Sequence, residues 1–302
     1  MEFEEGTGVD LGNVSDVRGG GFPGGGLVAG GGGALGLIGL VIALLLGGNP
    51  LSGGPGGFGV QEPGFGGPAA SPASSDLAGQ SCNAGTGPNG RIDVFATCAF
   101  NDAQRIWAQI FSEAGRRYTP ATLVLYTGRT QTGCGVGSSA AGPFYCPADQ
   151  RVYLDLSFFD ELRRSLGAPG DFAQAYVIAH EVGHHVQNVL GTNEQVANAT
   201  RKKPSQENEL SVRVELQADC YSGVWANVSQ RAERGIRLDE GDAAEAVRAS
   251  GQIGDDRLQR SAGQRVNPES FTHGSAEQRT RWLNRGLEAG DPARCDTFRT
   301  DI

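Results

Sequence analysis

The chain has 302 residues, a formal net charge of −9 and six cysteines, and 26 of its 48 glycines lie within the first 80 residues. Residues 1–80 carry a net charge of −6 and the remaining residues −3, so no basic stripe predicts binding to nucleic acid or to anionic lipid. The length allows one or two domains, and the glycine-rich first quarter has too few aromatic residues to bury a core.

The N-terminal quarter contains one long apolar stretch. Residues 1–26 are rich in glycine and acidic, and we expect a flexible tail there. Residues 27–46 carry no charge and no hydrogen-bonding side chain, and this length at ~1.5 Å rise matches a hydrocarbon layer about 30 Å thick. We therefore expect a transmembrane helix over 27–47 and a Gly/Pro/Ser-rich linker over 48–80. The alternatives are a signal-peptide core, against which the acidic preceding residues argue, and a buried helix, against which the glycine-rich flanks argue.

The folded domain is expected over 81–302, and it contains all six cysteines. None belongs to a C-x-x-C pair, which argues against a zinc ribbon or a thioredoxin-type motif. Their spacing favours the disulfides Cys82–Cys98 and Cys134–Cys146, leaving Cys220–Cys295, with buried free thiols as the alternative. Disulfides need an oxidising compartment, so we expect a single-pass protein of the cell membrane whose domain lies outside the cytoplasm.

Within this domain the first expected helix covers residues 93–113, where apolar residues recur at helical spacing. The segments 121–128 and 151–159 are rich in β-branched and aromatic residues and predict strands, with a loop between them. A helix with a capping box formed by Asp171 and Gln174 is expected up to Gly191. Further helices are expected over 205–232, 240–253 and 277–286. Strands followed by helices predict an α+β fold with a small antiparallel sheet and several helices.

The helix expected up to Gly191 contains the motif H-E-x-x-H at residues 180–184. On a helix, positions i and i+4 face the same way, so His180 and His184 present two imidazoles that can bind one Zn²⁺ ion. Glu181 lies next to this pair and can take a proton from water and pass it to a leaving amine. The alternative is a chance pair of surface histidines, but histidine occurs only four times in the chain. The motif therefore predicts a zinc site.

A catalytic zinc site needs a third protein ligand. His185 is turned by ~100° on the helix, so we expect it to support the site from outside the ligand set. The metzincin pattern fails, because Gln187 and Leu190 stand where that pattern has glycine and histidine. The segment SVRVELQADC offers Glu215 as the ligand and Asp219, one turn later, as the residue that orients His180 or His184. An exposed acidic pair is the alternative, but the surrounding apolar residues favour burial.

The fourth histidine, His273, is a candidate for stabilising the oxyanion of a tetrahedral intermediate, with Arg279 as its structural or electrostatic partner. The alternative is an ordinary loop histidine.

With these motifs in hand, the chain resembles the bacterial neutral zinc metallopeptidases, membrane proteins with a single span and a zincin-like domain. The resemblance covers roughly residues 85 to 300 and includes GDFAQAYVIAHEVGHHVQNVLG, LSVRVELQADCYSGVW and FTHGSAEQRTRWLNRG. It implies His180, His184 and Glu215 as metal ligands and Glu181 as the catalytic residue. THGSAEQR is also distantly similar to a segment of membrane-bound prenyl-protein and heat-shock zinc peptidases, which implies an oxyanion role for His273.

The leading hypothesis is a membrane-anchored zinc endopeptidase whose substrate is a peptide or protein. The predicted strand at 152–156 is a candidate for pairing with the backbone of an extended substrate. The competing hypothesis is a non-catalytic surface module that zinc stabilises, which would not need Glu181 as a proton shuttle.

Overall fold

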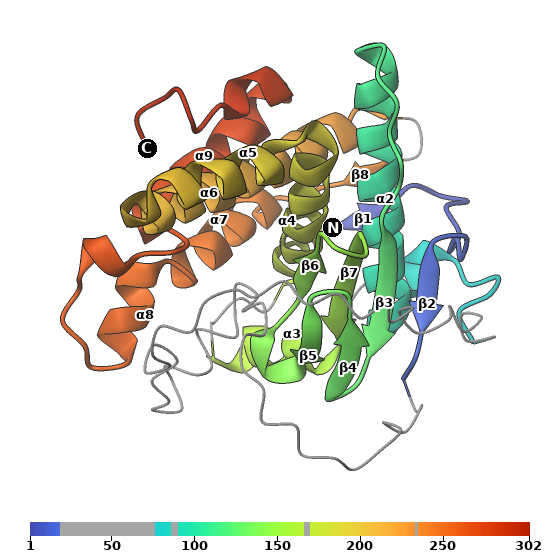
Figure 1. Cartoon of the computed structure of the whole chain (residues 1–302). Helices are drawn as coiled ribbons and strands as arrows, with labels where there is room; N and C mark the ends of the chain where they lie inside the picture. The colour runs from blue at the N-terminus through green and yellow to red at the C-terminus, as the bar shows by residue number, and fades with distance from the viewer. Residues whose placement is uncertain (19–75, 86–89, 166–169, 233–234) are drawn as a thin grey trace.

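The computed structural model describes residues 1–18, 76–85, 90–165, 170–232 and 235–302. The expected transmembrane helix over 27–47 lies outside these ranges, and so do residues 48–75 of the expected linker. Among the described helices, none combines the length and the apolar composition needed to span a bilayer. The described residues form an α+β fold in which a four-stranded sheet lies beside several long helices (Figure 1).

The main sheet is mixed, with the strand order β2-β3-β7-β6. Its strands are β2 (Val14–Asp16), β3 (Thr122–Tyr126), β6 (Phe144–Cys146) and β7 (Arg151–Asp155). β3 runs parallel to both β2 and β7, and only β6 runs antiparallel to its neighbour β7. The expectation of an antiparallel sheet is therefore wrong for the main sheet, although two further two-stranded sheets are antiparallel. One strand comes from the start of the chain, and the long connection from β3 to β7 allows these two strands to run in the same direction.

Both faces of β3 and β7 are buried. Leu123 pairs with Val152 and faces the main core against the helices, whereas Val124 pairs with Tyr153 and faces a second, smaller cluster. A hairpin of β4 (Arg129–Thr132) and β5 (Gly135–Ser138) covers part of this second face, with Gly137 lying against the ring of Phe144. Strands buried on both faces have continuous apolar sequences, which is why TLVLY shows no alternation. The loop expected between the two strands thus contains this hairpin and β6.

The first 18 residues belong to the folded body. β1 (Glu2–Phe3) pairs with β8 (Ile236–Arg237), and β2 forms one edge of the main sheet. Arg18 ends this segment in ion pairs with Asp16 and with Asp93. The expectation of a flexible tail over 1–26 is therefore wrong for residues 1–18. Glycine-rich composition hid two strands of two and three residues, which are too short to show a period.

The long helices expected from the sequence are present, and shorter ones join them. They are α2 (Ile92–Glu113), α3 (Ser157–Ser165), α4 (Asp171–Leu190), α5 (Thr192–Lys202), α6 (Glu207–Ser229), α7 (Asp242–Gln252), α8 (Asp255–Ser261) and α9 (Ala276–Ala289). α4 ends where expected, at Gly191, which adopts the left-handed conformation with φ 79°. The strand expected over 151–159 ends at Asp155, because Ser157 already starts α3.

The expected capping box of α4 is wrong. Gly170 is the N-cap, and Asp171 lies inside the helix. The carboxylate of Asp171 instead binds the α-ammonium group of Met1, and Oε1 of Gln174 has no hydrogen-bond partner among the described residues. A capping box does occur at α9, between Ser275 and Gln278.

α6 and α9 pack closely because each places a glycine at their contact. A Cβ atom added to Gly223 would lie 2.4 Å from the carbonyl oxygen of Leu283, and one added to Gly286 would lie 2.0 Å from that of Cys220. The two helices therefore touch backbone to backbone. This contact brings the chain around residue 215 next to the chain around residue 275 (Figure 1).

The three expected disulfides are confirmed. Cys82 is bonded to Cys98, Cys134 to Cys146, and Cys220 to Cys295. The second ties the β4–β5 hairpin to β6, and the third ties α6 to the segment after α9.

Candidate metal centre

His180 and His184 lie one turn apart on α4, and their ring centroids are 4.7 Å apart. The Nδ1 atom of each ring has a partner: Asp219 Oδ1 lies 2.9 Å from that of His180, and Gln187 Oε1 lies 2.9 Å from that of His184. A carboxylate or amide oxygen accepts hydrogen bonds, so both rings carry their proton on Nδ1. In the neutral form of each ring, Nε2 is thereby left as the lone-pair donor for a metal ion, and binding of the ion releases any proton held there.

Glu215 of α6 completes the group. Its Oε2 lies 3.2 Å from Nε2 of His180, and its Oε1 lies 3.5 Å from Nε2 of His184. Each of the three residues offers one ligand atom, and these three atoms all lie within 4.8 Å of one another. Two imidazoles and one carboxylate are a donor set typical of catalytic zinc, which keeps a fourth position open. His184 and Glu215 keep 15% and 13% of their side chains exposed, so the group fits a zinc ion that solvent and substrate can reach.

The charges of this group are strongly coupled. Burial opposes ionisation of Glu215, but the nearby His184, His180 and His273 outweigh it and hold the pKa of this carboxyl well below its usual range. Burial likewise opposes a charge on His180, but Asp219 and Glu215 raise the pKa of this imidazole to about 9. Burial lowers the pKa of His184. The carboxylate of Glu215 is therefore ionised and ready to bind a cation.

Asp219 is the centre of a buried network behind His180. Besides the His180 ring, its carboxylate accepts hydrogen bonds from Tyr176 Oη at 2.6 Å and from Arg279 Nη2 and Nε at 2.8 and 3.0 Å. The structure thus places Asp219 where the sequence predicted an orienting residue. Arg279 contacts Asp219 rather than His273, the partner expected for it.

Glu181 is only 2% exposed and lies under the edge strand β6. Burial raises the pKa of its carboxyl to about 8, and the charge of Glu215 acts in the same direction, whereas His180 acts in the opposite one. The backbone N–H of Tyr145 in β6 points at this carboxyl and also acts to lower its pKa. A carboxyl with a pKa near neutrality can both take up and release a proton.

The substrate-pairing role expected for residues 152–156 is wrong. These residues belong to β7, which is hydrogen-bonded to β3 on one side and to β6 on the other. Within the described part of the chain, β2 and β6 are the two edge strands of the main sheet, and of these β6 contacts α4 and reaches Glu181 through the backbone of Tyr145. The edge near Glu181 is therefore that of β6.

His185 points away from the metal ligands. Its Nδ1 lies 3.0 Å from Tyr145 Oη, and its Nε2 lies 2.7 Å from the carbonyl oxygen of Thr119. The ring is fully buried between Tyr118 and Tyr145. His185 thus fastens β6 to α4 rather than orienting a metal ligand directly.

His273 lies in the segment between α8 and α9, beside α6. Its Nδ1 lies 3.2 Å from Asp255 Oδ1, and its charge lowers the pKa of Glu215. The structure therefore brings the fourth histidine to the group formed by His180, His184 and Glu215, as the sequence suggested.

Sequence reasoning missed the partners of these residues. Gln187 was considered only as a departure from another motif, although its i, i+3 spacing from His184 already allowed contact. Tyr176 is one turn before His180, on the same helix face. Tyr145 and Asp255 come from distant segments, and no local pattern pointed to them.

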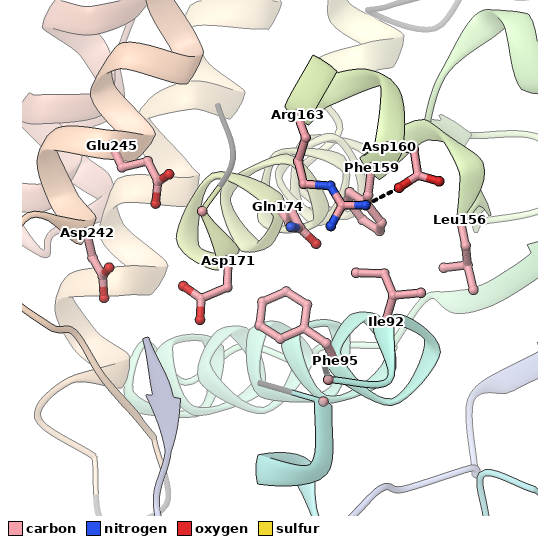
Figure 2. Close-up of a pocket in the computed structure, with 13 residues that line it drawn as sticks. Ile92, Phe95, Leu156, Phe159, Asp160, Arg163, Asp171, Gln174, Asp242 and Glu245 are labelled. Atoms are coloured by element: carbon pink, nitrogen blue, oxygen red, sulfur yellow. Dashed lines mark hydrogen bonds and ion pairs between the residues drawn. The ribbon is translucent and has the colours of Figure 1, made fainter. Parts of the chain in front are cut away.

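A second group of carboxylates lies at the start of α4, on one side of a pocket that Ile92 and Phe159 also line (Figure 2). The group consists of Asp171, Asp242 and Glu245. The α-ammonium group of Met1 lies 3.1 Å from Asp171 and 2.9 Å from Asp242. Burial opposes its charge, but these carboxylates and that of Asp239 raise its pKa to about 10. An internal cation therefore pairs with two of the three carboxylates of this cluster.

Comparison with known proteins places the chain in a family. Residues 1–298 match the family described as "Putative neutral zinc metallopeptidase". The uncharacterized protein YpfJ of Escherichia coli (strain K12) is 51% identical over 209 residues, which are 69% of this chain and 72% of that protein. The uncharacterized protein Rv2575 of Mycobacterium tuberculosis (strain H37Rv) is 39% identical over 225 residues, 72% of this chain and 74% of that protein.

No solved structure matches the chain. The family match covers nearly the whole sequence, including both helices that carry the histidines and Glu215. The chain therefore belongs to the neutral zinc metallopeptidase family.

Proposed function

We propose that the protein is a zinc-dependent peptidase that hydrolyses internal peptide bonds of a peptide or protein substrate. The observation that carries the proposal is the convergence of His180, His184 and Glu215 within 4.8 Å, with Glu181 next to them. A structural zinc site has four protein ligands and needs no proton acceptor. Three ligands beside a buried carboxyl of raised pKa suit hydrolysis.

The residues divide the reaction as follows. A zinc ion bound by His180, His184 and Glu215 supplies a Lewis acid that polarises the scissile carbonyl and makes water more acidic. Glu181 accepts the proton that the attacking water loses and delivers it to the nitrogen of the departing amine. His273 donates a hydrogen bond to the oxyanion that forms as the carbonyl carbon becomes tetrahedral.

Substrate binding is proposed to use the unpaired edge of β6. An extended peptide can add to an exposed sheet edge by backbone hydrogen bonds, largely independent of its side chains. Tyr145 is in the middle of this strand, and its backbone N–H points toward the Glu181 carboxyl. A peptide paired with β6 would therefore pass close to the catalytic carboxyl.

The substitution Glu181→Gln tests the mechanism. It keeps the shape of the side chain and removes the proton acceptor, so cleavage of an unfolded protein is expected to fall by roughly 10²- to 10⁴-fold. Zinc content, measured on the same preparations, is expected to stay at that of the wild type. Glu194→Gln is the matched control, because Glu194 is exposed on α5, away from the site. Full activity of Glu181→Gln at full zinc content would refute the mechanism.

The competing function is a surface module that zinc stabilises without catalysis. In that case chelation of zinc lowers the thermal stability, and Glu181→Gln changes nothing else. The burial of Glu181 beside the ligands favours the peptidase, because it raises the pKa of this carboxyl to about 8, which suits proton transfer and which a purely structural zinc site does not need.

The cellular location is part of the proposal. The three disulfides support a domain that folds outside the cytoplasm. We propose that residues 27–47 attach the chain to the cell membrane. Fusion of a disulfide-dependent reporter enzyme after residue 302 is expected to give activity, and the fusion is expected to resist carbonate extraction from membranes. An inactive reporter, or one recovered in the soluble fraction, would contradict this location.

A further inference from the structure

The carboxylate of Asp255, at the start of α8, is enclosed by the three residues Thr272 to Gly274. Its Oδ2 accepts hydrogen bonds from the backbone N–H groups of Thr272 and His273, both at 2.7 Å, and of Gly274 at 3.0 Å. Its Oδ1 lies 3.2 Å from Nδ1 of the His273 ring. Asp255 is only 4% exposed. The Asp255 carboxylate therefore fixes the backbone of residues 272–274 and also contacts the ring of His273.

The same segment is fixed against the helix that provides Glu215. Ser211 Oγ donates a hydrogen bond of 2.8 Å to the carbonyl oxygen of Thr272, and Ser211 lies one turn before Glu215 on α6. Gly274 has φ 96°, and a Cβ atom there would lie 3.2 Å from Leu216. The chain can therefore turn closely over α6 only because residue 274 is glycine. This turn keeps His273 beside Glu215.

The contacts of the ring decide which nitrogen carries the proton. Nδ1 of His273 lies 3.2 Å from Asp255 and 2.9 Å from Thr272 Oγ1, whereas Nε2 forms no hydrogen bond within the described part of the chain. An ionised carboxylate only accepts hydrogen bonds, so Nδ1 must carry a proton to bond with it. When both ring nitrogens carry a proton, Nε2–H is the group left free to donate a hydrogen bond.

We infer that Asp255 is a positioning residue, which occupies Nδ1 of His273 and so turns the Nε2–H group of the doubly protonated ring toward the oxyanion of the substrate. This inference rests on the proposed peptidase function. Asp255 does not touch the substrate itself. It sets the orientation of the ring, so that the donor nitrogen already faces the place where negative charge develops.

The variants Asp255→Asn, His273→Ala and the double variant test this role in the zinc-loaded protein. In Asp255→Asn the amide oxygen can still accept from the backbone, and the amide NH₂ then faces Nδ1 and cannot accept its hydrogen bond, so the ring loses the contact that orients it. We expect kcat to fall by roughly ten- to a hundredfold, less than the 10²- to 10³-fold of losing an oxyanion donor, with KM changed by less than about twofold.

The double variant is expected to be no slower than His273→Ala alone, because Asp255 acts only through His273. Asp256→Asn is the control: it removes the adjacent carboxylate, which caps Ala276 and pairs with Arg260 but does not contact His273. Multiplicative losses in the double variant, or a kcat of Asp255→Asn equal to that of the wild type, would overturn the inference.

A second measurement does not depend on activity, and its decisive reading is made on the wild type. The chain has four histidines, so the imidazole nitrogen NMR signals of the wild type can be assigned by substituting each in turn. We expect His273 to carry its proton on Nδ1 when neutral, and to lose this preference in Asp255→Asn. A neutral wild-type ring protonated on Nε2 would overturn the inference. Retained activity in Glu181→Gln would instead refute the proposed function, so the two failures are distinguishable.

Discussion

Arg279 of α9 donates two hydrogen bonds to Asp219 of α6, at 2.8 and 3.0 Å, and neither side chain is exposed to solvent. Asp219 in turn contacts the ring of His180 on α4. Three helices that are distant in the sequence are therefore joined at one carboxylate, directly behind a proposed metal ligand. A substitution at Asp219 would therefore affect both the orientation of His180 and the packing of the three helices.

Removal of one partner of this ion pair is expected to be costly. Arg279→Met leaves a buried carboxylate without its counter-charge, and we expect the free energy of unfolding to fall by about 3–5 kcal/mol. The double variant Asp219→Asn/Arg279→Met removes both charges and is expected to regain part of that loss. Urea unfolding of the three proteins measures both effects. Equal stability of Arg279→Met and the wild type would contradict the importance of the pair.

Gln187 is expected to control zinc affinity through His184. Gln187→Leu removes the oxygen that accepts from Nδ1 of His184, and zinc affinity is expected to fall by roughly ten- to a hundredfold. Gln187→Glu keeps an acceptor there and should keep most of the affinity. Both variants lose the hydrogen bond that Gln187 Nε2 donates to the carbonyl oxygen of Val214, so their difference isolates the contact with His184. Competition with a chelator of known affinity measures the result, and equal affinities would rule out this role.

The glycine at the contact of α6 and α9 is expected to tolerate no side chain. Gly223→Ala places a methyl group 2.4 Å from a backbone oxygen of α9, and we expect a loss of roughly 1–3 kcal/mol or more in unfolding free energy. Gly251→Ala is the matched control, since a Cβ there would meet its nearest atom, Thr280 Oγ1, at 3.3 Å. Alanine is the better helix former, so this control should stay within about 1 kcal/mol of the wild type. Similar losses in both variants would mean that the close approach of the helices is not the cause.

If the substrate pairs with β6, every second backbone N–H group of the substrate should matter for binding. Side chains and backbone groups alternate in direction along an extended chain, so only every second N–H group of the substrate can face β6. Methylation of these nitrogens, one at a time, is expected to raise KM by up to roughly tenfold, the loss of about one hydrogen bond, and methylation of the others should have little effect. A scan of N-methylated peptides measures this pattern. Equal sensitivity at all positions would argue against strand addition.

The ligands were predictable from the sequence because their spacing is local. His180 and His184 are one turn apart on a helix with clear periodicity and a glycine stop, and Glu215 and Asp219 repeat the same spacing on α6. The donor set of a zinc hydrolase then identified the carboxylate needed from elsewhere in the chain. The helices and their candidate zinc ligands could therefore be predicted from residues that are close together in the sequence.

The strand order and the supporting partners were not predictable in this way. β2 pairs with β3, more than a hundred residues later, and nothing in the three residues Val14–Asp16 specifies that partner. Asp255 was one acidic residue among many until the turn at Gly274 brought His273 to it. Such contacts depend on how whole elements pack, which no local pattern records.

The pairing of β2 with β3 also restricts how the chain can meet a bilayer. Residues 1–18 and the described residues after position 75 belong to one folded body, and they flank the apolar stretch at 27–46. A helix that crossed the bilayer once in this stretch would leave the two parts on opposite faces. Docking of β1 and β2 and a single crossing are therefore mutually exclusive for one molecule. In a molecule whose chain crosses the bilayer once, β2 would be absent from the sheet and β3 would become an edge strand. The membrane topology of the protein therefore shows whether β1 and β2 are docked.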